Sequence, residues 1–222
     1  MTLTLLNIYN SVASQAWSMF DDEVNTKAEF ENVLISSINK ALSDLWCSTD
    51  FPFRRRTEEI ILMEDSNEYE LPNGNLVPRN INGKKGFQVS IDGEYLDYIE
   101  TPNLSYKHLG KPTSYYICDN NIYFYPTPDQ NYEVAMDYFT LAIGTDKKGN
   151  SIYALNEESD SIDIPEKFEE LFKNALITKT MLYAIASDSD ENYSNYKRQF
   201  DTAYKLLLKY TTGKTPERKV LF

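Results

Sequence analysis

The chain has 222 residues, of which 41% are hydrophobic and 25% are charged, and its net charge is −12. These values are ordinary for a soluble globular protein with one large domain or two small ones. The negative net charge argues against equilibrium binding to nucleic acid and against a membrane-surface role, because phosphate groups bind to Lys and Arg side chains. The acidic charge is compatible with a channel wall along which DNA moves without binding. We expect no signal peptide and no bilayer-spanning run.

Two helices are predicted at the start of the chain. Residues 3–20 carry apolar side chains at helical spacing, from Leu5 to Phe20. A second helix is expected over 26–47, where Thr26 and Glu29 fit a capping box that satisfies backbone N–H groups at a helix start. Its apolar stripe, from Phe30 to Leu45, is typical of a helix facing a core.

A linker over residues 50–56 leads from these helices into a region rich in strand-forming residues. It holds three consecutive arginines, Arg54 to Arg56. They are interpreted either as a solvated strand edge, the favoured reading, or as a contact for acidic surfaces or phosphate. A strand is expected at 58–63, and a short strand that runs into a turn is expected over 69–74, followed by a loop over 75–86.

Two hairpins and a long strand follow. Asp92-Gly93 separates the alternating runs 87–91 and 94–99, and this pair favours a tight turn with positive φ at both positions. A second hairpin occupies Gly110 to Pro128, with Asp119-Asn120-Asn121 as its turn and prolines at its end. Residues 132–143 are predicted to form a closing strand with Tyr132, Val134, Met136 and Tyr138 on one face. Residues 144–161 are expected to be loop, except for the apolar run 152–155.

The chain then returns to helices. Asp163 and Pro165 predict the start of one helix, and apolar spacing from Tyr193 to Tyr210 predicts another. The fold class is therefore predicted as α+β: a four-helix layer with an inserted antiparallel β-hairpin lobe. The expected domains are a helical domain (1–50 and 162–211), an inserted β domain (55–145) and an extended C-terminal tail (212–222).

No catalytic or cofactor motif is found. The single histidine, His108, has no catalytic motif around it, and its position predicts an exposed loop residue. Cys47 and Cys118 lack metal-site spacing and are interpreted as small buried hydrophobes, with a disulfide left open. We therefore expect no enzyme activity and no cofactor, and no residues are predicted as metal ligands. Whether a metal ion is bound cannot be read from the sequence.

A series of short motifs resembles the head-to-tail adaptors of short-tailed bacteriophages, also called head–tail connectors or tail tubular protein A-like proteins. The motifs are Leu42-Ser-Asp-Leu-Trp46, Phe51-Pro-Phe-Arg-Arg-Arg-Thr57, Tyr69-Glu-Leu-Pro72, Gly110-Lys-Pro112, Ile122-Tyr-Phe-Tyr-Pro126-Thr-Pro128 and Ile164-Pro165-Glu166. Their order and spacing together carry the resemblance, which runs from about Ala41 to Tyr210.

The resemblance implies a structural protein of the virion neck, assembled in the host cytoplasm. Such adaptors form a homo-oligomeric ring of twelve subunits beneath the portal protein, extend the DNA channel without sequence-specific binding, and receive the next tail protein. Carried onto this chain, the expected portal contact is the tail that includes Lys214, Arg218, Lys219, Val220, Leu221 and Phe222. The expected next-ring contacts are two hairpin turns, Asp92 with Gly93, and Asp119 with Asn120 and Asn121.

Three other functions stay open at this stage. The first is another neck or tail ring protein of the same virion, which differs only in its position. The second is a carbohydrate-binding β module, for which Tyr115, Tyr123 and Tyr125 would have to form an exposed platform. The third is a hydrolase with two carboxylates about 5–10 Å apart in a cleft.

Overall fold

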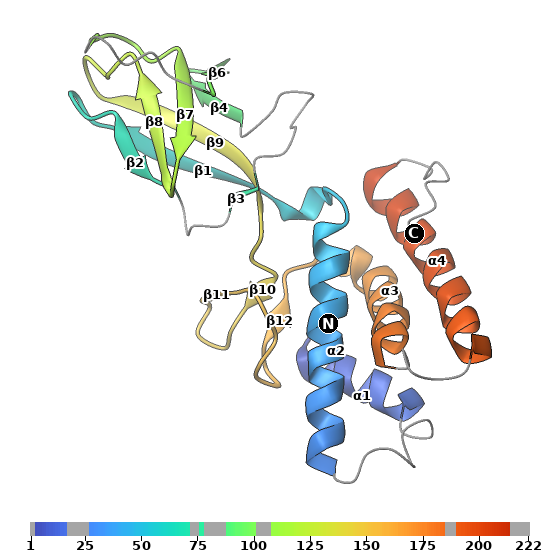
Figure 1. Cartoon of the computed structure of the whole chain (residues 1–222). Coiled ribbons are helices and arrows are strands. Elements are labelled where there is room, and N and C mark those ends of the chain that lie inside the picture. Colours follow the sequence, from blue (N-terminus) through green and yellow to red (C-terminus); the bar gives the residue numbers. More distant parts are fainter. Residues whose placement is uncertain are drawn as a thin grey trace. The chain divides into compact units, whose positions relative to one another are not determined.

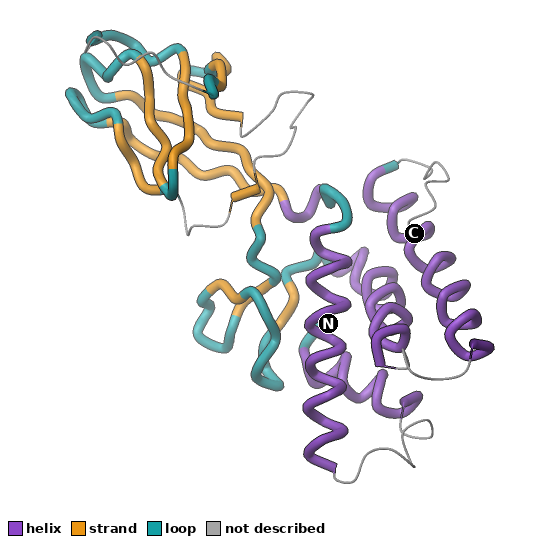
Figure 2. Tube along the Cα trace, in the orientation of Figure 1, coloured by secondary structure: helices purple, strands orange, loops and turns teal. Residues whose placement is uncertain are grey.

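The computed structural model describes residues 3–16, 27–71, 76–77, 88–100, 108–184 and 190–213 (Figure 1). Helices lie at both ends of the chain and strands lie between them (Figure 2), which confirms the predicted α+β class. The named strands pair antiparallel except for residues 97–98, which pair in parallel with 114–115. The chain divides into two compact units: Met1–Phe53 with Ala142–Phe222, here called the helical unit, and Arg54–Leu141, here called the β unit.

The described part of the helical unit contains four α-helices: α1 (Leu5–Ala16), α2 (Lys27–Cys47), α3 (Glu166–Ala184) and α4 (Asp190–Thr212). Both predicted N-terminal helices are confirmed over these bounds, while the capping residue Thr26 lies outside the described residues. Pro165 precedes α3, and its carbonyl accepts a hydrogen bond from the Phe168 N–H at 2.8 Å. Proline suits this place because the first N–H groups of a helix have no intrahelical partner.

An aromatic cluster fills the core of the helical unit where α2 ends. Trp46, Phe51 and Phe172 are each at most 1% exposed. The short 3₁₀ turn Pro52–Arg54 brings Phe53 onto Phe51, with ring centroids 4.9 Å apart. The rings of Phe172 in α3 and Trp46 pack edge to face with their centroids 6.0 Å apart, which is a preferred aromatic geometry.

A small three-stranded sheet also belongs to the helical unit, and the expectation of loop over residues 144–161 was wrong here. Its strands are β10 (Gly144–Thr145), β11 (Ser151–Ile152) and β12 (Ser161–Ile162), with β10 in the middle. Two-residue strands have no alternation that a sequence pattern can show. A Cβ atom on Gly144 would lie 1.7 Å from the Ser161 carbonyl oxygen, so the close approach of these strands requires glycine.

The β unit contains two sheets that share one core. The first sheet has the order β1 (Arg55–Leu62), β9 (Tyr132–Thr140), β4 (Gln88–Ile91) and β5 (Glu94–Tyr95), and β3 (Leu76–Val77) also pairs with β9. The second has the order β2 (Glu68–Glu70), β8 (Asn121–Tyr125), β7 (Ser114–Cys118) and β6 (Asp97–Tyr98). Side chains from both sheets, including Val134, Met136, Tyr115 and Phe124, form one buried cluster.

The two predicted hairpins are confirmed. Asp92 and Gly93 have φ of 54° and 79°, as a type I′ turn requires. The second turn is shorter than expected, because Asn121 already pairs with Cys118 as the first residue of β8. The expected strand 94–99 is divided: Leu96 N–H bonds to Val89 in the first sheet, and Asp97 N–H bonds to Thr113 beside the second.

Candidate partner-binding surface

Loops from four parts of the chain meet at one end of the β unit. The Asp65 N–H bonds to the Pro128 carbonyl at 2.9 Å, and the Thr127 N–H bonds to the His108 carbonyl at 2.8 Å. We call residues 63–66, 92–95, 108–113 and 126–131 the distal loop cluster. Strand β1 runs from Arg55, paired with Phe139, to Leu62, paired with Tyr132. The cluster therefore lies at the end opposite to the one where the chain enters and leaves the β unit.

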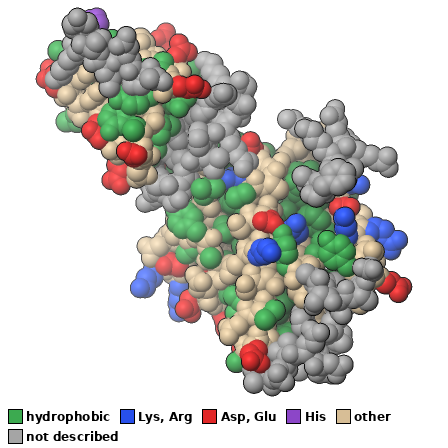
Figure 3. Space-filling model, viewed as in Figure 1, with side chains coloured by type: hydrophobic (Ala, Val, Ile, Leu, Met, Phe, Trp, Pro, Cys, Tyr) green, Lys and Arg blue, Asp and Glu red, His purple; other side chains and the backbone are tan. Residues whose placement is uncertain are grey.

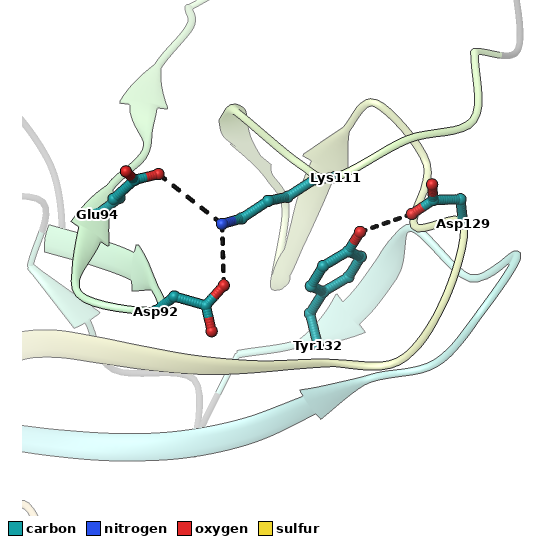
Figure 4. Close-up of polar contacts among 5 residues, drawn as sticks. All are labelled: Asp92, Glu94, Lys111, Asp129 and Tyr132. Carbon is teal, nitrogen blue, oxygen red and sulfur yellow. Dashed lines mark hydrogen bonds and ion pairs between the residues drawn. The ribbon is translucent and has the colours of Figure 1, made fainter.

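Charged side chains tie these loops together (Figure 4). The Lys111 Nζ atom lies 2.9 Å from Asp92 Oδ2 and 3.8 Å from Glu94 Oε2. The hydrogen bond with Asp92, supported by the nearby negative charges, raises the pKa of Lys111 above its usual value. The Tyr132 hydroxyl donates to Asp129 Oδ1 at 2.7 Å, which raises the pKa of Tyr132. Both groups therefore keep their protons at neutral pH.

Apolar side chains are exposed at the same end. The exposed large hydrophobic residues described in the β unit are Ile61, Met63, Tyr95 and Leu109, which are 60%, 54%, 51% and 50% exposed. All four lie in the distal loop cluster or at the ends of the strands next to it. Exposed acids, including Glu64, Asp65 and Asp129, lie in the same loops. Apolar anchors inside a charged rim are typical of a surface that binds another protein.

The structure brings together some of the residues predicted to contact a partner and separates others. Asp92 and Gly93 lie in the distal loop cluster. Asp119, Asn120 and Asn121 close the other end of the β7–β8 hairpin, about 13 Å away along β8 at 3.3 Å per residue. The predicted portal-contact residues, Lys214, Arg218, Lys219, Val220, Leu221 and Phe222, lie outside the described residues.

Sequence reasoning missed Lys111, Asp129 and the exposed apolar side chains of the cluster. Their loops come from distant parts of the chain, and only the pairing of β1, β4 and β9 brings these loops to one end. Gly110 and Pro112 do mark Lys111 as a loop residue, but nothing local indicates its carboxylate partners.

The three arginines of the run differ in their surroundings. Arg54 is 0% exposed, and its Nε and Nη2 atoms donate to the Thr140 carbonyl at 3.1 and 3.0 Å. Arg55 pairs with Asp137 at 2.6 Å across the β1–β9 ladder. The favoured interpretation, a solvated strand edge, is therefore wrong for Arg54, whose guanidinium is buried, and confirmed for Arg55, which is exposed on the edge strand β1.

The tyrosine platform proposed for a carbohydrate module is not formed. Tyr115 is 1% exposed, because it faces the core opposite Phe124. The outer face of β7 and β8 instead carries Tyr116 stacked on Tyr123, with ring centroids 4.7 Å apart, and Glu68 accepts the Tyr123 hydroxyl at 2.8 Å. Hydrophobic side chains over β8 and β7, flanked by acidic ones, are visible on this face in Figure 3.

The described part of the chain also shows how the cysteines, the histidine and the candidate metal ligands are placed. No group of three or more His, Cys, Asp and Glu side chains there is placed to hold a metal ion. Cys47 and Cys118 are exposed thiols that form no disulfide, so the expectation that they are buried was wrong. His108 is exposed, as predicted. Within the same residues, no helix has the length and apolar character needed to cross a bilayer.

Comparison with known proteins agrees with the resemblance seen in the sequence motifs. No curated protein matches the chain significantly. A family model described as SU10 adaptor protein matches residues 4–219, which is nearly the whole chain. This match confirms the likeness to phage head-to-tail adaptors and includes the start of the chain and residues 144–161, for which the motifs gave nothing. The chain therefore belongs to the SU10 adaptor protein family and is a structural adaptor protein of a bacteriophage virion.

Proposed function

We propose that the protein forms the ring that joins the portal of the phage head to the tail and extends the DNA channel between them. The observation that carries this proposal is the family match over residues 4–219. Twelve copies would build the ring, as expected from the resemblance, and the complex would assemble in the host cytoplasm. A net charge of −12 per copy suits a channel through which DNA passes without sequence-specific binding during genome ejection.

The distal loop cluster is the proposed contact for the next tail protein. Its exposed apolar side chains and acidic rim favour a partner with an apolar centre and basic groups around it. The turn at Asp119, Asn120 and Asn121 belongs to a different surface, so any contact it makes is a separate one. The C-terminal residues Lys214, Arg218, Lys219, Val220, Leu221 and Phe222 are the proposed portal contact.

A charge-reversal experiment tests the role of the distal loop cluster. The double variant Glu64→Lys with Glu94→Lys reverses two exposed acids of the cluster, and Glu59→Lys with Glu70→Lys reverses two exposed acids outside it. Each variant would complement a phage that lacks the wild-type gene. We expect the first variant to give filled heads that carry the adaptor but lack tails, and the control to give complete particles. Equal tail attachment in both variants would exclude the distal loop cluster as the tail contact.

A truncation tests the proposed portal contact. A chain that ends at Thr212 keeps all four described helices, so it should fold and keep its helical circular dichroism signal. We expect its co-purification with the co-expressed portal protein to fall at least tenfold. A chain lacking only Val220–Phe222 separates the apolar end from the basic residues before it. Unchanged portal binding by both truncated chains would show that the tail is not the portal contact.

A further inference from the structure

The helical unit has a groove that its own described residues leave open. The groove runs between α3 and α4 and has a volume of about 360 Å³. Leu171, Ala203 and Leu206 supply its apolar lining, and Asn174, Arg198, Gln199 and Thr202 supply the polar part. Leu206 is 43% exposed, and Tyr210, one turn further along α4, is 61% exposed. The apolar surface therefore continues beyond the groove.

The charge on α4 differs from that of the rest of the protein. Its described side chains include four exposed cations (Lys197, Arg198, Lys205 and Lys209) and two exposed acids (Glu191 and Asp201). The whole chain, by contrast, has a net charge of −12. Lys and Arg side chains are visible along α4 in Figure 3. Among the described residues Arg198 forms no ion pair, and its Nη2 atom donates to Asn195 Oδ1 at 3.3 Å.

The complementary surface lies on another helix of the same unit. The N-terminal half of α2 exposes Val33, at 44%, and one turn earlier on the same face it exposes Glu29. Helix α3 packs between α2 and α4, so the two surfaces lie on the outer helices of the layer seen in Figure 1. An apolar side chain near an acid is thus exposed on one outer helix, and an apolar groove with an arginine in its lining lies between the other outer helix and α3.

We propose that the α3–α4 groove receives the Glu29–Val33 face of α2 from a second copy of this chain. The proposal rests on the ring-forming function proposed above. A closed ring needs two different, complementary surfaces on each copy, because neighbours meet head to tail. Copies that each carry −12 repel one another, so a contact between them needs local pairing of opposite charge, which Arg198 and Glu29 supply.

Cysteine cross-linking tests this contact in the assembled complex. The background variant Cys47→Ser with Cys118→Ser removes both exposed native thiols. Into it are placed Val33→Cys, Leu206→Cys, or both, and each protein is co-expressed with the portal protein and oxidised mildly. We expect the double variant to give a ladder of disulfide-linked multimers. The two single variants, mixed on one portal, should give linked dimers and nothing larger.

The controls separate this proposal from the proposed function. Each single variant alone should give no cross-link, and a dimer from Leu206→Cys alone would show two-fold pairing and overturn the head-to-tail contact. A ring visible on the portal without cross-links in the double variant would overturn the groove contact and leave the ring-forming function intact. Failure of the background variant to form any ring on the portal would contradict the proposed function itself, and the groove contact with it.

A charge swap gives a second readout that does not depend on thiols. Arg198→Glu and Glu29→Arg should each lower ring assembly on the portal at least fivefold, and the two changes together should restore a large part of it. Asp201→Arg, an exposed change on the same helix but not among the groove residues, is the matched control. A double variant no better than the single variants would contradict a pairing between these two residues.

Discussion

Arg54 shows how one residue decides the local structure of the β unit. Its side chain is fully buried, and two of its nitrogen atoms donate to the carbonyl of Thr140, the last residue of β9. A guanidinium is always charged, so burial is tolerated only where its donors find acceptors. Arg54 thereby holds the start of β1 to the end of β9, the point where the chain enters and leaves the β unit.

Replacement of Arg54 should therefore destabilise the β unit. We expect Arg54→Ala to cost about 3 kcal/mol, because it removes the buried stem of the side chain and leaves the Thr140 carbonyl without these donors. Hydrogen exchange measured by mass spectrometry would locate the effect in the amides of β9. Arg56→Ala, a half-exposed neighbour, should cost less than about 1 kcal/mol. Similar protection in both variants would contradict a structural role for Arg54.

Asp137 makes the stability of the β unit depend on acid. Partial burial opposes its charge, but hydrogen bonds from Thr57 and Arg55 outweigh this and lower the pKa of Asp137 below its usual value. A lowered folded-state pKa stabilises the fold above the unfolded value of about 3.9, and this contribution is lost as pH falls further through the folded-state pKa.

The Asp137→Asn variant tests this dependence. At pH 7 it should be about 1–2 kcal/mol less stable than the wild type, because it loses hydrogen bonds to a charged acceptor. The difference should shrink below about pH 4, where the wild-type carboxylate takes up its proton. The measurement is urea unfolding at a series of pH values. A difference that stays constant down to pH 2 would show that the charge of Asp137 is not the cause.

At the scale of elements, the small sheet of β10, β11 and β12 depends on a glycine. The Gly144→Ala variant would place a methyl group 1.7 Å from the Ser161 carbonyl oxygen, so β10 and β12 would have to separate. We expect a loss of at least about 2 kcal/mol in the stability of the helical unit. Gly110→Ala is the matched control, because its Cβ would meet nothing closer than 3.8 Å. Equal thermal stability of the two variants would contradict this account of Gly144.

Elements with a strong periodic pattern could be predicted from the sequence, and the contacts between distant segments could not. The helix α2 and the Asp92-Gly93 turn follow from local spacing and turn chemistry. The division of the strand after that turn between two sheets does not, because Leu96 stays paired with Val89 in the same hairpin while Asp97 bonds to Thr113 beside the other sheet. Asp92 was predicted as a contact residue because it lies in a turn that local sequence reveals. Its partner Lys111 was not predicted, because the two residues come from separate loops.

The alternation of side chains along a strand indicates which residues lie on the same face of the sheet. Tyr115 and Tyr123 lie on adjacent strands, and the carbohydrate-module alternative required both on one exposed platform. The register pairs Tyr115 with Phe124 and Tyr116 with Tyr123, so Tyr115 faces the core and Tyr116 faces outward. The length of the β7–β8 turn sets the register of the two strands. With that length known, the period of two would have assigned Tyr116 to the outer face.

At the scale of the whole molecule, charge and exposed apolar surface are distributed unevenly. The β unit exposes its large apolar side chains at the distal loop cluster, next to acids, whereas α4 exposes Leu206 and Tyr210 next to cations. A monomer gains nothing from either surface, and a protein that meets a different neighbour through each of them does. This arrangement suits the proposed place of the chain between the portal, its own copies and the tail.

The most direct test of the proposed function is co-expression with the portal protein of the same phage, followed by cryo-electron microscopy of the purified complex. We predict a ring of twelve copies stacked on the portal, with the distal loop cluster of each copy exposed at the end away from it. A protein that stays monomeric and does not bind the portal would contradict the head-to-tail ring and would favour a position elsewhere in the neck or tail.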